Sequence, residues 1–219
     1  HWVTAVVDMP VIPKLPASVR GWHSVLRACR DAGAAGVTSI NSVSAIVGVN
    51  LETMEPQPSL RGYSTYSGYT GPAIKPIALR VVSQISKAGD LPISGVGGVT
   101  TWEDAAEFLL LGASCVQVCT AVMWSGYSIV TRMIAGLSGY LEDKGFESVQ
   151  ELVGRANERV VDNMFDLEPD YGLTAFVTER CTRCGRCVTA CRDGAHQAIS
   201  GGEGVVPVVD PAVCVGCGL

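Results

Sequence analysis

The chain has 219 residues, of which 47% are hydrophobic and 17% charged, and its formal net charge is −5. This length accommodates one main domain and a second, smaller one. The acidic balance argues against a nucleic-acid partner, and no apolar run approaches the roughly 18 residues that a membrane span requires.

Strands and helices are predicted to alternate along the first 160 residues. In chain order the pattern predicts the tail of a helix at 1–7, a strand at 10–15, a helix at 18–32 that ends at Gly33, a strand at 36–40, a helix at 74–88, a strand at 92–94, a helix at 101–111 capped by Thr100 or Thr101, a strand at 114–122, and helices at 128–144 and 149–159. Four strands that alternate with helices predict a parallel α/β sheet. The sheet is either doubly wound and open or half of a barrel.

The ends of the predicted strands favour the barrel. Polar residues follow several strands, and a glycine pair follows the strand at 92–94. In (β/α)8 barrels, the loops after strands seven and eight commonly bind a phosphate. We therefore expect residues 1–160 to form the C-terminal half of a (β/α)8 TIM barrel.

Three further segments complete the predicted organisation. The connection from 44 to 72 is rich in Gly, Ser, Tyr and Pro, and connections of that length are usually functional. A linker is expected at 161–178 and a small cysteine domain at 179–219. Within that domain, 197–200 and 205–210 flank a glycine-rich turn and predict a hairpin.

The cysteine domain carries the most specific motif in the chain. Cys181, Cys184, Cys187 and Cys191 follow the spacing C-x2-C-x2-C-x3-C, and Cys214 and Cys217 begin a second copy. In bacterial ferredoxins, three such thiolates hold one [4Fe–4S] cluster and the fourth binds the other. The spacing predicts a truncated ferredoxin-like 2[4Fe–4S] domain, with three ligands for each cluster. A zinc site would pair CxxC units at a longer spacing, and a disulfide framework suits secreted domains.

Two loops could bind a phosphate. Val96, Gly97 and Gly98 end a strand before a helix, where glycines let backbone N–H groups approach an anion. Cys119 and Thr120 end the next strand and add further N–H donors and a hydroxyl group. The two loops together predict a phosphate cradle, although a tight turn alone would also explain the glycines.

Lys14, Asn41 and Ser42 are the remaining candidates for a binding site. Lys14 ends a strand, and an ammonium group there could stabilise the anionic reduced form of a flavin, although an ordinary lysine that reaches solvent from a loop is the alternative. Asn41 offers a donor and an acceptor together, which suits the N–H/C=O edge of a cyclic imide, although an Asn-Ser pair also commonly forms a turn. Cys29 and Cys115 are expected to be small core side chains.

These segments resemble the dihydropyrimidine dehydrogenase family, and within it the FMN and iron–sulfur subunit of the bacterial NAD-dependent enzyme. The resemblance is carried by PxxxKLP, GVTxxNSVS, SGYTGPAIKPIALR, PISGVGGVTTWEDAAEFLLLGA, VQVCTAVM and the paired cysteine motifs. The barrel part is also similar to class 1 dihydroorotate dehydrogenases, which lack the fused ferredoxin-like domain. We keep two alternatives, a dihydroorotate dehydrogenase-like flavin oxidoreductase and a ferredoxin-type electron-transfer module.

The resemblance implies an enzyme that reduces uracil or thymine to the 5,6-dihydropyrimidine. Electrons would come from NAD(P)H through an FAD-containing partner subunit in a hetero-oligomer. Nine cysteines with a cluster motif fit a reducing compartment, so we expect a cytoplasmic location. The resemblance further implies that Asn41 and Ser42 bind the pyrimidine. The residues implied to contact FMN are Lys14, Gly71, Val96, Gly97, Gly98, Cys119 and Thr120.

The resemblance assigns no catalytic residue to this sequence. The general acid of the family is a cysteine on a loop before the strand that contains Lys14, and that loop would lie upstream of His1. The sequence starts with His1 and stops within its second cysteine motif. We therefore expect it to be part of a longer chain, and we expect the fragment alone to be inactive.

Overall fold

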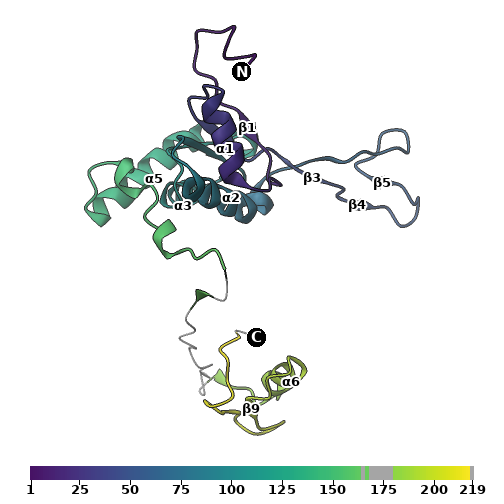
Figure 1. Ribbon diagram of the computed structural model, residues 1–219. Helices are drawn as coiled ribbons and strands as arrows, with labels where there is room; N and C mark the ends of the chain where they lie inside the picture. The colour runs from purple at the N-terminus through teal and green to yellow at the C-terminus, as the bar shows by residue number, and fades with distance from the viewer. Residues whose placement is uncertain (164–165, 168–179, 218–219) are drawn as a thin grey trace. The chain divides into compact units, whose positions relative to one another are not determined.

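The computed structural model describes residues 1–163, 166–167 and 180–217. The chain divides into two units, His1–Val160 and Val161–Leu219, and each unit has helices and strands of its own (Figure 1). The linker predicted at 161–178 lies largely outside the described residues.

The first unit is built on a parallel sheet of four strands, as the alternating pattern predicted. The strands stand in the order β1-β2-β7-β8. Their bounds are β1 Lys14–Leu15, β2 Val37–Ser39, β7 Ile93–Val96 and β8 Cys115–Gln117. The register aligns Lys14 with Thr38, Thr38 with Ser94, and Ser94 with Cys115. Because the strands are parallel, all four carboxyl ends lie at one edge of the sheet.

Helices cover one face of this sheet. They are α1 Trp22–Asp31, α2 Lys75–Ala88, α3 Trp102–Leu110, α4 Thr120–Ser125 and α5 Ser128–Lys144, with short 3-10 turns at η1 Pro72–Ile74, η2 Val149–Leu152 and η3 Asn157–Arg159. Alternate strand residues such as Val37 and Ile93 join the apolar sides of the helices in one core. Gly95 lies so close to Phe108 that a Cβ there would be 2.5 Å from the ring. The close packing of α3 on the sheet therefore requires a glycine in β7.

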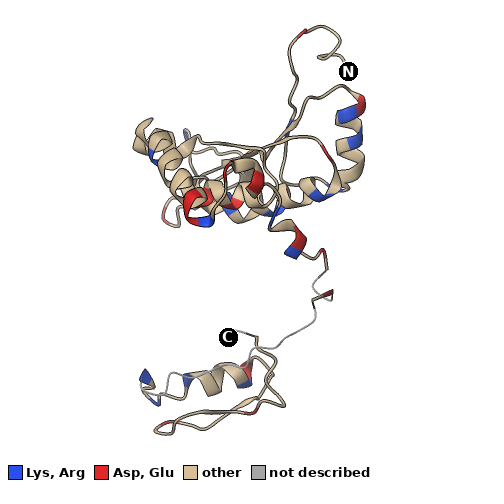
Figure 2. Ribbon diagram, turned by 90° about the vertical axis from the view of Figure 1, so that its left-hand side faces the viewer, with Lys and Arg blue, Asp and Glu red and all other residues tan. Residues whose placement is uncertain are grey.

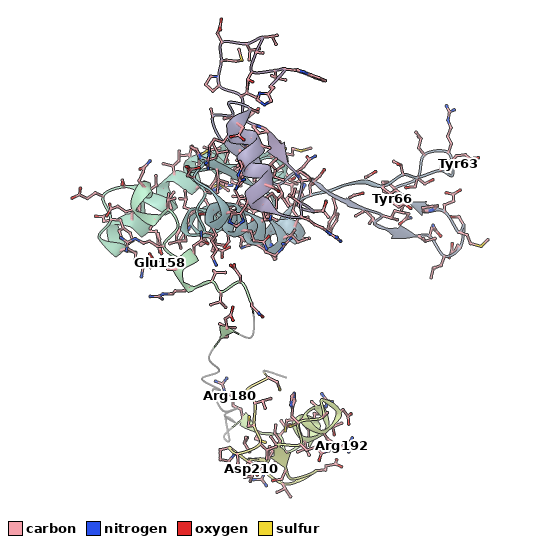
Figure 3. All side chains as sticks on the ribbon, in the orientation of Figure 1. Tyr63, Tyr66, Glu158, Arg180, Arg192 and Asp210 are labelled. Carbon is pink, nitrogen blue, oxygen red and sulfur yellow. The ribbon has the colours of Figure 1, made fainter. Side chains whose placement is uncertain are left out.

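The connection at 44–72 is an extended two-stranded arm. Strand β3 (Val43–Ala45) pairs with β6 (Ser67–Tyr69), and β4 (Gly48–Val49) pairs with β5 (Pro56–Gln57), both antiparallel. Figure 1 shows this arm running out from the sheet. Its aromatic side chains Tyr63 and Tyr66, labelled in Figure 3, are largely exposed.

Several predicted elements of the first unit were wrong in type or extent. Of the strand predicted at 10–15 only Lys14–Leu15 is β1, and the helix predicted at 18–32 starts at Trp22. Residues 1–7 form a hydrogen-bonded turn, because a single turn lacks the neighbouring turns that stabilise a helix. The strand predicted at 114–122 ends at Gln117, and the chain turns at Cys119 into α4. The helix predicted at 149–159 is two 3-10 turns separated by Gly154, whose φ is 80°.

The second unit contains one helix and a short hairpin within its described residues. Helix α6 spans Arg186–Asp193 and starts inside the first cysteine motif, which the cysteine spacing did not predict. Strands β9 (Ile199–Ser200) and β10 (Val208–Val209) pair antiparallel. The predicted hairpin between the two cysteine motifs is thereby confirmed.

Candidate functional site

A cavity of ≈ 260 Å³ lies at the carboxyl edge of the four-stranded sheet. Ligands of parallel α/β folds bind at this edge, because the loops that follow the strands meet there. All the residues predicted to bind cofactor or substrate line it: Lys14, Asn41, Ser42, Gly71, Val96, Gly97, Gly98, Cys119 and Thr120. The lining also includes Ile40, Thr70, Ile74, Val99, Thr100 and Gln117, which the sequence did not single out.

The glycine turn after β7 can be built only without side chains. Gly98 has a φ of 79°, in the left-handed region that favours glycine. A Cβ on Gly98 would lie 2.8 Å from the carbonyl oxygen of Gly71 and 2.9 Å from the backbone nitrogen of Lys75. The turn is therefore pressed against the segment that begins α2, which brings the loop of Gly71 and the glycine turn together in one wall of the cavity.

The hydrogen bonds of this wall leave some N–H groups available to a ligand. The carboxylate of Asp104 accepts hydrogen bonds from the N–H groups of Thr100, at 2.7 Å, and Thr101, at 3.0 Å. In the part of the chain that the structure describes, no hydrogen bond uses the N–H groups of Gly98, Val99 or Thr120. Because these three residues line the same cavity, their free donors suit an anion such as a phosphate group.

Asp104 also joins three segments of the fold. It is 7% exposed, completes a capping box with Thr101 at the start of α3, and accepts a hydrogen bond from Lys75 of α2 at 2.5 Å. Burial alone would raise the pKa of Asp104, but the hydrogen bonds from Lys75 and Thr100 outweigh burial and lower it. Hydrogen bonds to Asp104 and Glu107 raise the pKa of Lys75.

The clamp between α2 and α3 was not predicted from the sequence. The Thr-x-x-Asp spacing of the capping box was a visible signal for Asp104. The pairing with Lys75 joins positions 29 residues apart, and no local pattern predicts it.

The sheet face opposite the helices carries a row of polar side chains. The amide nitrogen of Gln117 donates to the Ser94 hydroxyl oxygen at 2.7 Å and to the Thr38 hydroxyl oxygen at 3.3 Å. Lys14 extends the row, since it pairs in register with Thr38. Cys115 also lies on this face, where it is exposed and donates to Ser94. The expectation that Cys115 is a core side chain was therefore wrong, because strand alternation places it on the side away from the helices.

Asn41 and Ser42 follow β2 and separate the sheet from the arm. Asn41 is exposed, whereas Ser42 is half-buried against Gly68, where a Cβ would lie 2.3 Å from the Ser42 hydroxyl oxygen. The arm thus fixes one side of Ser42 and leaves Asn41 accessible in the cavity wall. Cys29 is half-buried against the core, as expected, and burial raises its pKa.

The two cysteine motifs of the second unit differ in arrangement. Cys191, Cys214 and Cys217 line one small cavity, and the N–H of Ala198 donates to the Cys191 sulfur at 3.2 Å. Hydrogen bonds of this kind to sulfur tune iron–sulfur clusters. Among residues 1–163, 166–167 and 180–217, no set of three His, Cys, Asp or Glu side chains is drawn together as a metal site.

The thiol of Cys184, the second cysteine of the first motif, is exposed. Hydrogen bonds from the N–H of Arg186 and from the Thr182 hydroxyl group lower the pKa of Cys184. A thiol that ionises readily is suited to bind a metal, since the thiolate is the ligand.

Comparison with known families assigns most of the first unit to a protein family. The sequence profile described as dihydroorotate dehydrogenase matches residues 1–141. The chain belongs to the dihydroorotate dehydrogenase family. A profile described as a 4Fe-4S binding domain matches residues 175–195, so the chain combines parts of a flavin-dependent oxidoreductase and an iron–sulfur protein.

Similar proteins include both a dihydropyrimidine and a dihydroorotate dehydrogenase. The NAD-dependent dihydropyrimidine dehydrogenase subunit PreA of Escherichia coli K12 is 44% identical over 199 residues, which cover 89% of this chain and 48% of PreA. The catalytic subunit of dihydroorotate dehydrogenase B (NAD(+)) of Pyrococcus abyssi is 43% identical over 154 residues, which cover 70% of this chain and 50% of that protein. The chloroplastic dihydropyrimidine dehydrogenase (NADP(+)) of Arabidopsis thaliana is 36% identical over 161 residues, which cover 71% of this chain and 38% of that protein.

These matches confirm the predicted family resemblance. The chain spans about half the length of the Escherichia coli and Pyrococcus abyssi proteins. None of the helices in the described part of the chain is long and apolar enough to cross a membrane.

Proposed function

We propose that this chain contributes an FMN site and two [4Fe–4S] clusters to a dihydropyrimidine dehydrogenase that reduces uracil or thymine. The proposal rests mainly on one observation, the convergence of Lys14, Asn41 and the Gly98 turn on a single cavity at the carboxyl edge of the sheet. The similarity to PreA also extends beyond residues 1–141 and covers 89% of the chain. This favours dihydropyrimidine dehydrogenase over dihydroorotate dehydrogenase B, for which 70% of the chain is covered.

The cavity fits a flavin mononucleotide in its donors and charge. The free N–H groups of Gly98, Val99 and Thr120 would hold the phosphate. Gly71, Val96, Gly97 and Cys119 would shape the wall around it. Lys14 would place its ammonium group beside the electron-rich end of the ring, where a cation lowers the energy of the reduced, anionic form.

The substrate would lie against Asn41 and Ser42. A carboxamide donates and accepts at once, which matches the adjacent N–H and C=O groups of a pyrimidine-dione. The Ser42 hydroxyl group, held against Gly68, would add one further hydrogen bond. Bound FMN would supply the hydride for the reaction. We assign no general acid within this chain and propose that a cysteine outside it supplies the proton.

We further propose that the sheet is the second half of a (β/α)8 barrel. Helices cover one face, whereas Lys14, Cys115 and Gln117 are exposed on the other, where a first half of the barrel would cover them as interior residues. Ligand pockets usually measure about 300–1,000 Å³, so a cavity of ≈ 260 Å³ would hold part of FMN. The first half of the barrel would complete the site.

Electrons would reach the flavin through the clusters from a partner subunit that binds FAD and NAD(P)H, in a cytoplasmic hetero-oligomer. Cys191, Cys214 and Cys217 would hold one cluster, since they already line one cavity. Cys181, Cys184 and Cys187 would hold the other by motif spacing. Each cluster would take its fourth ligand from elsewhere.

The test uses the native protein that contains this sequence, isolated without oxygen together with its partner. NADH-dependent loss of uracil absorbance is the expected result. Conversion of dihydroorotate with no change in uracil would favour the dihydroorotate dehydrogenase alternative. Loss of neither substrate by a preparation that transfers electrons to artificial acceptors would favour the electron-transfer module.

A further inference from the structure

The first cysteine motif carries a regular pattern of positive charge. Each of its first three cysteines follows an arginine directly, in the run Arg180-Cys181-Thr-Arg183-Cys184-Gly-Arg186-Cys187. We name Arg180, Arg183 and Arg186 the arginine face. The other three motif cysteines follow Ala190, Val213 and Gly216, so the second motif has no such charge.

The three arginines are exposed, and the loop that bears them is fixed by backbone contacts. The carbonyl oxygen of Arg183 accepts a hydrogen bond from the N–H of Gly204 at 2.9 Å, and Arg186 is the first residue of α6. Figure 2 shows basic residues of this unit at one end of α6 and a further basic residue beside an acidic one at its other end. Arg183 and Arg186 therefore flank the exposed Cys184 in an anchored loop, and Arg180 precedes them by one repeat of the pattern.

Few acids neutralise the arginine face. Within the described residues, no ion pair involves these three arginines, whereas Arg192 at the other end of α6 pairs with Asp193 at 3.0 Å. One exposed acid, Glu203, has its backbone beside Gly185 in the same loop. Glu179 precedes Arg180 in the sequence, so the run retains an excess of positive charge within a chain of net charge −5.

We propose that the arginine face is the docking surface for a one-electron carrier protein whose own redox centre is surrounded by carboxylates. The proposal rests on the proposed function, because it requires a cluster at Cys181, Cys184 and Cys187. Guanidinium groups bind carboxylates in a planar, bidentate manner. Opposite charges also steer encounter and raise association rates about 10- to 1,000-fold at low salt.

The location of the charge on only one motif gives the docking a direction. The carrier would meet the cluster of Cys181, Cys184 and Cys187, because the arginines precede these cysteines, and the electron would pass to or from the second cluster through it. A single electron passes between carrier and cluster, one being oxidised as the other is reduced, and no atom or proton need be transferred.

The test measures electron transfer from the native protein that contains this sequence, with its clusters reduced anaerobically, to an oxidised acidic flavodoxin and to basic cytochrome c. In the wild type, the rate to flavodoxin should fall steeply as salt is added, because screening shortens the reach of the charges. Replacing Arg183 and Arg186 by Gln should lower the low-salt rate to flavodoxin about tenfold and leave or raise the rate to cytochrome c. Replacing both by Lys should retain most of the flavodoxin rate.

Arg192→Gln is the matched control, because Arg192 lies in the same unit (Figure 3) but is already paired with Asp193. It should leave both rates unchanged. The proposal is overturned if the double Gln variant transfers electrons to flavodoxin as fast as the wild type at low salt. It is also overturned if Arg192→Gln lowers that rate as much as the double Gln variant does, or if the double Gln variant lowers the rates to flavodoxin and cytochrome c equally. A chain without iron–sulfur absorbance before mixing would instead refute the cluster assignment, and the docking surface would fall with it.

Discussion

Replacing Gly98 by Ala should damage the proposed phosphate site. The added Cβ would lie 2.8 Å from the Gly71 carbonyl oxygen and 2.9 Å from the Lys75 nitrogen, and both neighbours are backbone atoms. An L-residue in the left-handed region costs about 1–2 kcal/mol, and overpacking costs about 1–3 kcal/mol. We expect Gly98→Ala to lower the free energy of unfolding by about 2–5 kcal/mol.

The matched control for this variant is Gly139→Ala. Gly139 lies inside α5, has no positive φ, and has no atom within 4 Å of its added Cβ. Alanine there should stabilise the chain by up to about 1 kcal/mol. Urea denaturation of the native protein that contains this sequence measures both effects. Titration of that protein with FMN after removal of its flavin, followed by quenching of the FMN fluorescence, measures the site itself.

The cofactor titration separates a loss of fold from a loss of the site. We expect Gly98→Ala to weaken FMN binding at least about tenfold, which is about 1.4 kcal/mol, at urea concentrations where the chain is folded. If Gly98→Ala bound FMN as tightly as Gly139→Ala and unfolded at the same urea concentration, the contact between the glycine turn and α2 would not define the site.

Three further changes test other parts of the account. Asp104→Asn should lower the free energy of unfolding by about 2–3 kcal/mol, because Lys75 loses its buried partner. Because the pKa of Asp104 is lowered in the folded state, its contribution to the free energy of unfolding is present above the ordinary pKa of 3.8 and is lost as the pH falls from there through the folded pKa. Stability should therefore fall less steeply toward acid pH in the Asn variant than in the wild type. An unchanged acid dependence would contradict the clamp. Lys14→Gln should weaken FMN binding about tenfold with little change in the urea midpoint, since Lys14 is exposed; equal affinity would remove Lys14 from the site. Cys191→Ser should lower the bound iron, measured by colorimetric assay, by about half. The control Cys115→Ser alters an exposed thiol of the first unit and should retain all of the iron. Equal iron in both variants would refute the ligand assignment.

The sequence predicted the elements of the site better than the contacts that hold it. Parallel strands bring their carboxyl ends to one edge, so Lys14, Asn41 and Thr120 could be placed near one another from the βα pattern alone. The clamp of Lys75 on Asp104 could not, because it depends on how two helices pack on the sheet.

Local patterns also failed where tertiary packing decides the outcome. The apolar run at 114–122 resembles one strand, yet the turn at Cys119 divides it into β8 and α4. Cys115 resembles a core residue, but the core lies only on the helix side of the sheet. The antiparallel pairing of the arm had no turn signal that fixed its register in the sequence.

The most direct test of the central claim is the chromophore content of the native protein, isolated without oxygen. We predict a visible spectrum with both flavin and iron–sulfur bands, FMN released on denaturation, and about eight iron atoms per flavin from two four-iron clusters. A colourless protein, or one whose cysteines hold only zinc, would contradict the account.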